Sequence, residues 1–132
     1  MSNCNTEVVQ AIYKAFGDRD VEAVKTMVGP EFSITQTEQL PWGGSYQGTE
    51  GLQQFFAKLF GNVDSRVEFD EFFEAGDRVI AIGHTRGRVR SNNAPFDVRI
   101  VHLWTVEDGI AIRFEPFIDT PKMLEAIAAQ PS

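Results

Sequence analysis

The sequence contains a single cysteine, Cys4, among its 132 residues. An intramolecular disulfide is therefore impossible, and a cysteine-based metal site is implausible. The two histidines, His84 and His102, lie apart without the spacing of metal ligands, so we expect no metal. Long apolar runs are also missing, since no stretch approaches the roughly 18 residues of a membrane-spanning helix. The polar N-terminus lacks the pattern of a signal peptide. We expect a cytoplasmic protein without a membrane partner.

Basic residues are outnumbered, because 12 Lys and Arg against 19 Asp and Glu give a formal net charge of −7. Nucleic acids and anionic membranes require a basic surface, so this charge argues against both as partners. The chain also lacks a phosphate-binding glycine loop, a nucleophile elbow and a dinucleotide fingerprint, and we expect no cofactor. Phenylalanine is abundant instead, and its 11 residues predict a thick aromatic core or an apolar cavity. The length fits a single domain over residues 1–132.

Apolar residues at helical spacing predict four helices. The first ends at Gly17-Asp18 and buries Val9, Ile12, Tyr13 and Phe16. A short second helix begins at Asp20 and ends before Gly29-Pro30. The clearest helix is predicted to be capped by Thr49, with an apolar stripe of Leu52, Phe55, Phe56, Leu59 and Phe60. Thr120-Pro121 predicts the start of a final short helix.

Alternating patterns predict the strands. The first covers residues 32–38 and is followed by a turn-rich loop, residues 40–48, whose Trp42 and Tyr46 either serve a functional site or seal the core edge. Further strands are predicted over 67–75, 78–90 and 96–106, followed by a hairpin. The order α-α-β-α-β-β-β-β-α is typical of the α+β class, with helices packed on one face of a bent sheet and a cavity between the layers.

The segment from Val101 to Asp119 surrounds Asp108-Gly109, a strong hairpin signal because both turn residues must accept φ > 0. With a two-residue turn, His102 faces Glu115 and Trp104 faces Arg113. One face is then almost wholly apolar, with Val101, Leu103, Ile112, Phe114 and Ile118. The other face has the mixture typical of a small-molecule site, with His102, Trp104, Arg113, Glu115, Phe117 and Asp119.

Each titratable residue on this hairpin has two interpretations. Asp119 is a general acid or base with a pKa raised by an apolar pocket, or it caps the last helix. His102, oriented by Glu115, is a proton shuttle or a satisfied core histidine. Arg113 stacks on Trp104 and polarises a substrate carbonyl, or it pairs with Glu115. A row of alternating cations, His84, Arg86, Arg88 and Arg90, forms an anion site or a solvated strand face.

Four segments together carry a family resemblance: residues 17–24 (GDRDVEAV), 48–56 (GTEGLQQFF), 75–79 (AGDRV) and 102–119. In their order and spacing the chain resembles the nuclear transport factor 2-like superfamily, and within it the SnoaL-like group of polyketide cyclases and ketosteroid isomerase-related proteins. The resemblance implies a cone-shaped α+β fold, with helices packed on a strongly curved, mostly antiparallel sheet that encloses an apolar pocket. It also implies a homodimer.

In SnoaL-like cyclases an aspartate near the end of the last strand acts as acid or base beside a histidine, and Asp119 and His102 are the similar positions here. The ketosteroid isomerase pattern does not transfer. Its base aspartate aligns near Gln36, which cannot take a proton, and its oxyanion-hole tyrosine aligns near Ile12, beside Tyr13.

The preferred hypothesis is a cofactor-independent isomerase, cyclase or hydrolase that acts on a small apolar carbonyl compound by acid/base catalysis. Asp119 moves the proton, His102 assists and Glu115 orients His102. The predicted substrate-binding residues are Tyr13, Phe16, Gln36, Trp42, Tyr46, Phe55, Trp104, Arg113 and Phe117. The alternative is a non-catalytic ligand-binding or dimerisation module, because the first strand lacks the carboxylate and the apolar hairpin face can bury against a second subunit.

Overall fold

The computed structural model describes residues 5–129, so Cys4 lies outside the described residues. This part of the chain forms four helices and six strands: α1 (Asn5–Gly17), α2 (Val21–Lys25), β1 (Val28–Gln36), β2 (Gly44–Gln47), α3 (Gly48–Asn62), β3 (Val63–Ala75), β4 (Arg78–Val89), β5 (Pro95–Glu107), β6 (Ile110–Ile118) and α4 (Thr120–Ala128). The strands form one sheet in the order β2-β1-β6-β5-β4-β3. All neighbouring strands are antiparallel except β1 and β6, which run parallel. The predicted α+β class is confirmed, with a mixed and mostly antiparallel sheet.

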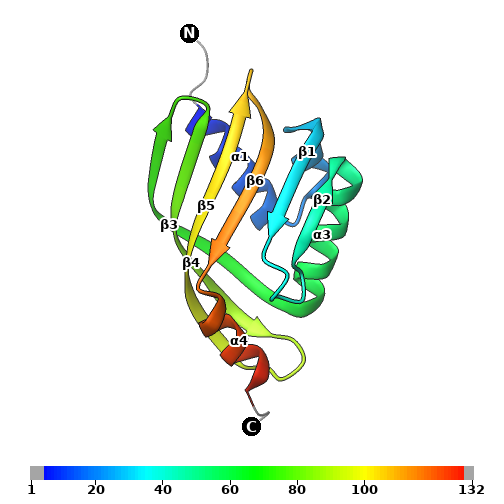
Figure 1. Cartoon of the computed structure of the whole chain (residues 1–132), viewed down its shortest axis with the longest axis vertical. Coiled ribbons are helices and arrows are strands. Elements are labelled where there is room, and N and C mark those ends of the chain that lie inside the picture. Colours follow the sequence, from blue (N-terminus) through cyan, green and yellow to red (C-terminus); the bar gives the residue numbers. More distant parts are fainter. Residues whose placement is uncertain (1–4, 130–132) are drawn as a thin grey trace.

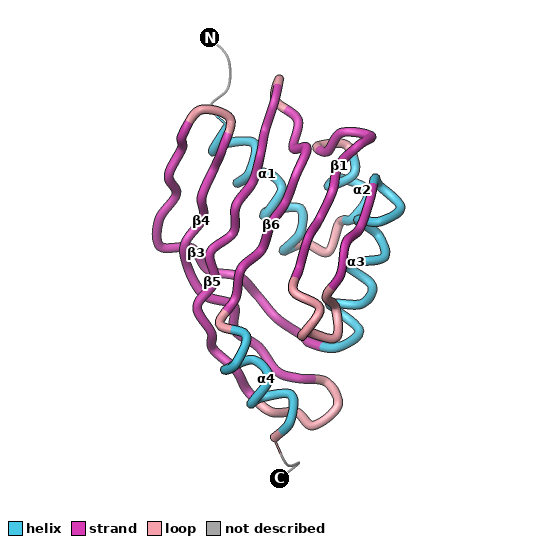
Figure 2. The backbone as a smooth tube through the Cα atoms, in the orientation of Figure 1, coloured by secondary structure: helices cyan, strands magenta, loops and turns pink. Residues whose placement is uncertain are grey.

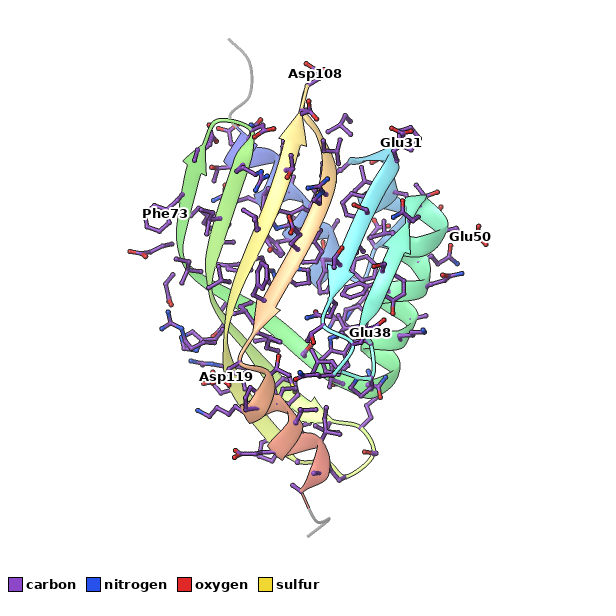
Figure 3. The ribbon with its side chains drawn as sticks, viewed as in Figure 1. Glu31, Glu38, Glu50, Phe73, Asp108 and Asp119 are labelled. Atoms are coloured by element: carbon purple, nitrogen blue, oxygen red, sulfur yellow. The ribbon has the colours of Figure 1, made fainter. Side chains whose placement is uncertain are left out.

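The sheet carries its long helices on one side (Figures 1 and 2). Helix α1 packs on β3, β4, β5 and β6, and α3 packs on β1, β2 and β3. Helix α4 lies against β5 at the end of the molecule opposite the start of α1. Figure 3 shows Glu31, Glu50 and Asp108 projecting outward at the rim. No helix within residues 5–129 is long and apolar enough to cross a membrane.

Strand β1 begins earlier than its alternating pattern predicts, at Val28 rather than at Phe32. Val28 pairs with Ala111 of β6, and regular pairing resumes at Ser33 and Arg113 after a register shift. Pro30 lies within this irregular stretch, where its missing N–H leaves no ladder hydrogen bond to break. The predicted stop of the second helix at Gly29-Pro30 is wrong, because α2 already ends at Lys25 with Thr26 as its C-cap and the Gly-Pro pair belongs to β1.

The loop predicted over residues 40–48 contains a strand that the sequence did not reveal. Strand β2 is only four residues long and pairs with β1 through Ile34 and Tyr46. Helix α3 follows it at once, beginning at Gly48, whose φ of 69° lies in the left-handed region. The predicted cap by Thr49 is wrong, because the N-cap position is Gln47 and no side chain caps this helix.

Strands β3 and β4 form the predicted hairpin at Gly76-Asp77. Strand β3 starts at Val63, directly after α3, and not at Val67 as predicted. At Gly83 and Gly87 of β4 an added Cβ would collide with the backbone carbonyl oxygens of Glu68 and Asp64. Because the neighbouring backbone occupies the place of a side chain, these two positions require glycine.

The hairpin between β5 and β6 turns at Asp108-Gly109 as predicted, but its register does not follow the two-residue count. Glu107 pairs with Ile110 and Val106 with Ala111, whereas the next residue of β5, Thr105, pairs with Arg113. The extra residue in β6 is a β-bulge. Beyond it every residue of β6 changes partner by one position, which exchanges the two faces of this strand.

Candidate functional site

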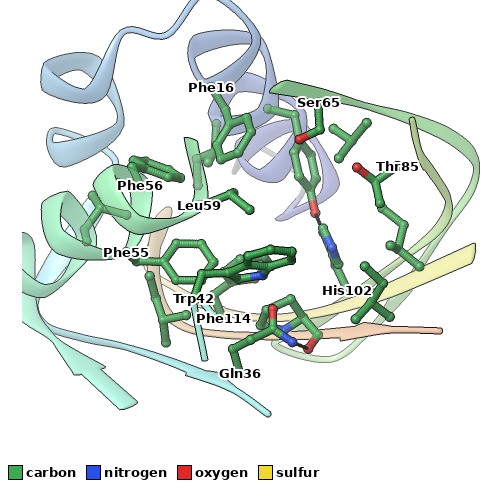
Figure 4. Close-up of a pocket in the computed structure, with 18 of the residues that line it drawn as sticks. Phe16, Gln36, Trp42, Phe55, Phe56, Leu59, Ser65, Thr85, His102 and Phe114 are labelled. Atoms are coloured by element: carbon green, nitrogen blue, oxygen red, sulfur yellow. Dashed lines mark hydrogen bonds between the residues drawn. The ribbon is translucent and has the colours of Figure 1, made fainter. Parts of the chain in front are cut away.

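A cavity of about 70 Å³ lies between the helices and the inner face of the sheet (Figure 4). That volume exceeds the roughly 15 Å³ that one enclosed water needs. Its walls are mainly aliphatic and aromatic, and both tryptophans of the chain, Trp42 and Trp104, contribute to them. The other polar residues in the walls are Tyr13, Gln36, Ser65, Thr85 and His102. Among the described residues that line this cavity, none is Asp, Glu, Lys or Arg.

Three ring side chains in the wall form a hydrogen-bonded chain with a fixed direction. Trp104 Nε1 donates to Tyr13 Oη at 2.8 Å, and Tyr13 Oη lies 2.6 Å from His102 Nδ1. Indole N–H is only a donor, so the tyrosine oxygen accepts from it. This oxygen could also accept from a protonated Nδ1, but its own proton would then lack an acceptor, because among the described residues His102 Nδ1 is the one acceptor bonded to it. His102 Nδ1 is therefore the acceptor, and the neutral ring carries its proton on Nε2.

Burial keeps both ends of the Tyr13–His102 bond uncharged. It lowers the pKa of His102 from 6.5 to about 3, because the imidazolium would lose its hydration without gaining a carboxylate. Burial also raises the pKa of Tyr13 well above 10, an effect that the hydrogen bond from Trp104 partly opposes. The His102 and Phe114 rings pack edge-to-face with centroids 5.0 Å apart. The imidazole therefore contacts an apolar ring and not a carboxylate that could stabilise its charged form. At neutral pH the cavity thus offers a neutral N–H donor.

Gln36 supplies a second polar group from the end of β1. Its side chain is 5% exposed, and its Nε2 donates to the backbone oxygen of Pro116 at 3.3 Å. A carbonyl oxygen only accepts, so the amide orientation is fixed, with Oε1 away from Pro116. Figure 4 shows this oxygen directed into the cavity, and no described residue donates a hydrogen bond to it.

The hydroxyl groups of Ser65 and Thr85 complete the polar lining. Both residues are buried on the inner faces of β3 and β4, diagonal to each other in the ladder, because Ser65 pairs with Gly87 and Thr85 with Val67. No described residue hydrogen-bonds to either hydroxyl. Ser65 was not predicted because the strand was expected to begin at Val67, whereas Thr85 lies within the predicted strand 78–90 but was not assigned to the site. The signal was present, since Val63, Ser65 and Val67 alternate with charged residues at strand spacing.

Seven of the residues predicted for the site line this one cavity, from four elements and the loop between β1 and β2: Tyr13, Phe16, Gln36, Trp42, Phe55, His102 and Trp104. Tyr46 does not line it. Its hydroxyl donates to the carbonyl oxygens of Trp42 and Gly43, and it thereby supports the loop that carries Trp42.

The cross-strand partners predicted between β5 and β6 are wrong, because the β-bulge shifts the register by one residue. Glu115 pairs with Leu103 rather than with His102, and Trp104 faces Phe114 rather than Arg113. The Trp104 and Phe114 rings stack with centroids 4.1 Å apart. The apolar face predicted for β6 is therefore the cavity face. The side chains expected in the cavity, Arg113, Glu115 and Phe117, lie on the opposite face of the sheet and outside the cavity lining.

Asp119 also lies outside the cavity lining. It is exposed at the junction of β6 and α4 (Figure 3), and its Oδ1 accepts a hydrogen bond from Lys122 N at 3.3 Å. It is the N-cap of α4, with Pro121 in the first turn. The capping interpretation matches this geometry, because a carboxylate at N-cap satisfies an otherwise free helix N–H.

The other histidine lies on the outer face of the sheet, in the row of cations predicted on β4. His84 Nδ1 lies 3.0 Å from Asp97 Oδ1, and Arg86 contacts both Asp97 and Glu68. His84 and Arg86 are thus paired with carboxylates, whereas Arg88 and Arg90 donate to the backbone oxygens of Asn93 and Phe60. Within residues 5–129, no group of three or more His, Cys, Asp or Glu side chains is placed to hold a metal ion.

Comparison with known proteins agrees with this fold. The SnoaL-like domain family matches residues 9–114, and the chain belongs to this family. The predicted superfamily and group are confirmed. No curated protein sequence matches the chain.

Solved structures with the same fold include a nuclear transport factor 2-like protein of unknown function from Burkholderia pseudomallei. It is 31% identical over 98% of this chain and 100% of its own, with a TM-score of 0.89. A similar protein from Burkholderia thailandensis is 26% identical over 97% and 100% of the two chains, with a TM-score of 0.88. TerC, crystallised with polyporic acid, is 31% identical over 95% of this chain and 98% of its own, with a TM-score of 0.86.

Proposed function

We propose that the protein binds a small, uncharged and mostly apolar compound in the cavity, and that His102 Nε2–H donates a hydrogen bond to a carbonyl-type oxygen of this ligand. The observation that carries the proposal is the chain from Trp104 through Tyr13 to His102, because it fixes a neutral donor in an apolar cavity. TerC, a relative of the same fold, is known in complex with polyporic acid, which supports small-molecule binding in this fold.

The lining favours an uncharged ligand over a charged one. A carboxylate or an ammonium group would lose its hydration in the cavity and would meet no described lining residue of opposite charge. Such burial is unfavourable by several kcal/mol. A carbonyl oxygen requires only the neutral donor that the site supplies.

Catalysis on the bound carbonyl is the second candidate function. A neutral histidine can polarise a carbonyl oxygen without donating its proton outright, as in triosephosphate isomerase. Full acid/base catalysis has less support, because His102 Nδ1 is engaged by Tyr13 and the described lining holds no carboxylate to remove a proton. Asp119 and Glu115 therefore have no part in the proposed site.

A homodimer formed through the outer face of the sheet is proposed as the assembled state. Val101 of β5 and Phe117 of β6 pair directly on this face, yet they are 39% and 56% exposed. Phe73 of β3 adds a third exposed apolar side chain. Exposed apolar groups of this size on a strand ladder are typical of an interface. Sedimentation velocity should find a dimer that Phe117→Glu converts to monomer; a wild-type monomer at all concentrations would contradict the dimer.

The binding proposal is testable by tryptophan fluorescence, because both tryptophans line the cavity. Three probes share one skeleton: indane, 1-indanone and indane-1-carboxylate. We expect 1-indanone to bind about tenfold more tightly than indane, the value of one well-placed hydrogen bond. The carboxylate should not bind measurably. Equal affinities for all three probes, or a preference for the carboxylate, would contradict the proposal.

Two tyrosine variants provide a matched pair for this test. Tyr13→Phe removes the hydroxyl that fixes the His102 tautomer, and we expect the preference for 1-indanone over indane to fall to about twofold. Tyr46→Phe deletes the same group at a site outside the cavity lining and should retain the preference. Equal loss in both variants would show that the preference does not depend on the His102 tautomer.

A further inference from the structure

Gln36 and His102 present opposite kinds of hydrogen-bonding atom to the same cavity. The described residues leave Oε1 of Gln36 without a donor, and it can only accept. The free ring nitrogen of His102, Nε2, carries a proton and can only donate. A ligand that satisfies both atoms must carry a donor at one end and an acceptor at the other.

The sheet places these two residues in one row on its inner face. His102 of β5 pairs with Pro116 of β6, and Gln36 of β1 bonds to the backbone oxygen of the same Pro116. Strand β6 therefore lies between the two, and adjacent strands are about 4.8 Å apart, so the backbones of β1 and β5 are separated by about 10 Å. A small ring system lying across Pro116 would therefore lie between the two side chains.

Burial makes the amide oxygen of Gln36 selective. The side chain is 5% exposed, so a ligand that fills the cavity excludes water from Oε1. A ligand without a donor at that end leaves the oxygen unpaired, which is unfavourable, whereas a hydroxyl group satisfies it.

On the basis of the binding function proposed above, we propose that the ligand is an uncharged hydroxy-carbonyl compound. Its carbonyl oxygen accepts from His102 Nε2–H, and its hydroxyl group, on the far side of the ring system, donates to Gln36 Oε1. Gln36 is the residue that distinguishes this ligand from the plain ketone.

The test compares 1-indanone with 5-hydroxy-1-indanone and 6-hydroxy-1-indanone, and with the corresponding methoxy compounds, by tryptophan fluorescence. The better hydroxy isomer should bind wild-type protein about tenfold more tightly than 1-indanone. Its methoxy counterpart, which cannot donate, should bind no more tightly than 1-indanone. This comparison needs no variant, so it stands even where a substitution prevents folding.

Gln36→Leu should abolish the gain from the hydroxyl group and leave the affinity for 1-indanone within about twofold. Gln54→Leu makes the same change on the exposed side of α3 and should retain the full gain. A hydroxyl gain that survives Gln36→Leu, or methoxy compounds that bind as well as hydroxy compounds, would overturn the assignment of Gln36. If the hydroxyl adds nothing while 1-indanone still binds more tightly than indane, only this inference fails. If 1-indanone shows no preference over indane, the proposed function itself fails.

Discussion

The two histidines of the chain lie only a few rows apart in the ladder of β4 and β5, yet on opposite faces of the sheet. His102 pairs with Ala81 and faces the cavity, where Tyr13 is its one hydrogen-bonding partner among the described residues. His84 pairs with Arg99 and faces outward, between Asp70 and Asp97. One residue type thus has a neutral aromatic environment on one face and a hydrated, charged environment on the other. Because successive side chains of a strand point to opposite faces of the sheet, the position of a histidine along its strand decides which of these environments it has.

The strongest test of this contrast compares two phenylalanines on the two faces of β6. Phe114 is 6% exposed and stacks on Trp104, so Phe114→Ala should lower the free energy of unfolding by about 3–5 kcal/mol. Phe117 is 56% exposed, and Phe117→Ala should change the free energy of unfolding of the monomer by less than about 1 kcal/mol. Urea denaturation at low protein concentration measures both. Equal losses would mean that the bulge does not exchange the faces of β6.

Acid should unfold the protein partly through His102. The pKa of His102 is about 3 in the folded state and near 6.5 in the unfolded chain, so between these pH values only the unfolded state takes up the proton. Acidification from pH 6 to pH 4 should therefore lower the free energy of unfolding by about 2 kcal/mol through this residue, and no further contribution arises below pH 3.

The variant His102→Gln cannot titrate at this position and should have a correspondingly flatter pH profile than the wild type. Denaturation curves at several pH values provide the measurement. A wild-type slope that persists in His102→Gln would show that carboxylates alone account for it.

Substitution of Asp119 should change the stability of the protein but not its affinity for the ligand. Asp119→Ala removes the N-cap of α4 and should lower the free energy of unfolding by about 1 kcal/mol without changing the affinity for 1-indanone. Asp119→Asn retains a capping oxygen and should be nearly neutral in both respects. A loss of binding in Asp119→Asn with unchanged stability would restore Asp119 to the site.

The smallest effect on the free energy of unfolding is expected for a substitution on the outer face of the sheet. Arg86 makes two ion pairs, with Glu68 and Asp97, but its side chain is 54% exposed. Exposed pairs contribute little, so Arg86→Gln should change the free energy of unfolding by less than about 1 kcal/mol, and less still in 1 M salt. A larger loss that salt does not reduce would show that this cluster behaves as a buried network.

Local patterns were sufficient for the fold class and for much of the site. Helical spacing placed Tyr13 and Phe16 on the buried side of α1, and strand alternation placed His102 and Trp104 on one face of β5. These assignments depend only on neighbours within a few residues, which is the range over which periodicity carries information.

The main incorrect prediction concerns β6, where one extra residue changes the pairing register with β5. The bulge at Ile112 is invisible to a turn count, and it moved Glu115 and Arg113 from the cavity to the opposite face. Strand β2 was missed because four residues are too few for a period to be recognised. The bond between Tyr13 and His102 joins residues 89 positions apart, and no local signal could reveal it.

The most direct test of the neutral donor is NMR of the His102 imidazole in protein labelled with ¹⁵N. We predict an Nε2–H tautomer with an unprotonated Nδ1, and no change in ring protonation from pH 8 down to pH 5, while His84 serves as the internal comparison on the outer face. Titration of His102 near pH 6.5, or a proton on Nδ1, would contradict the account.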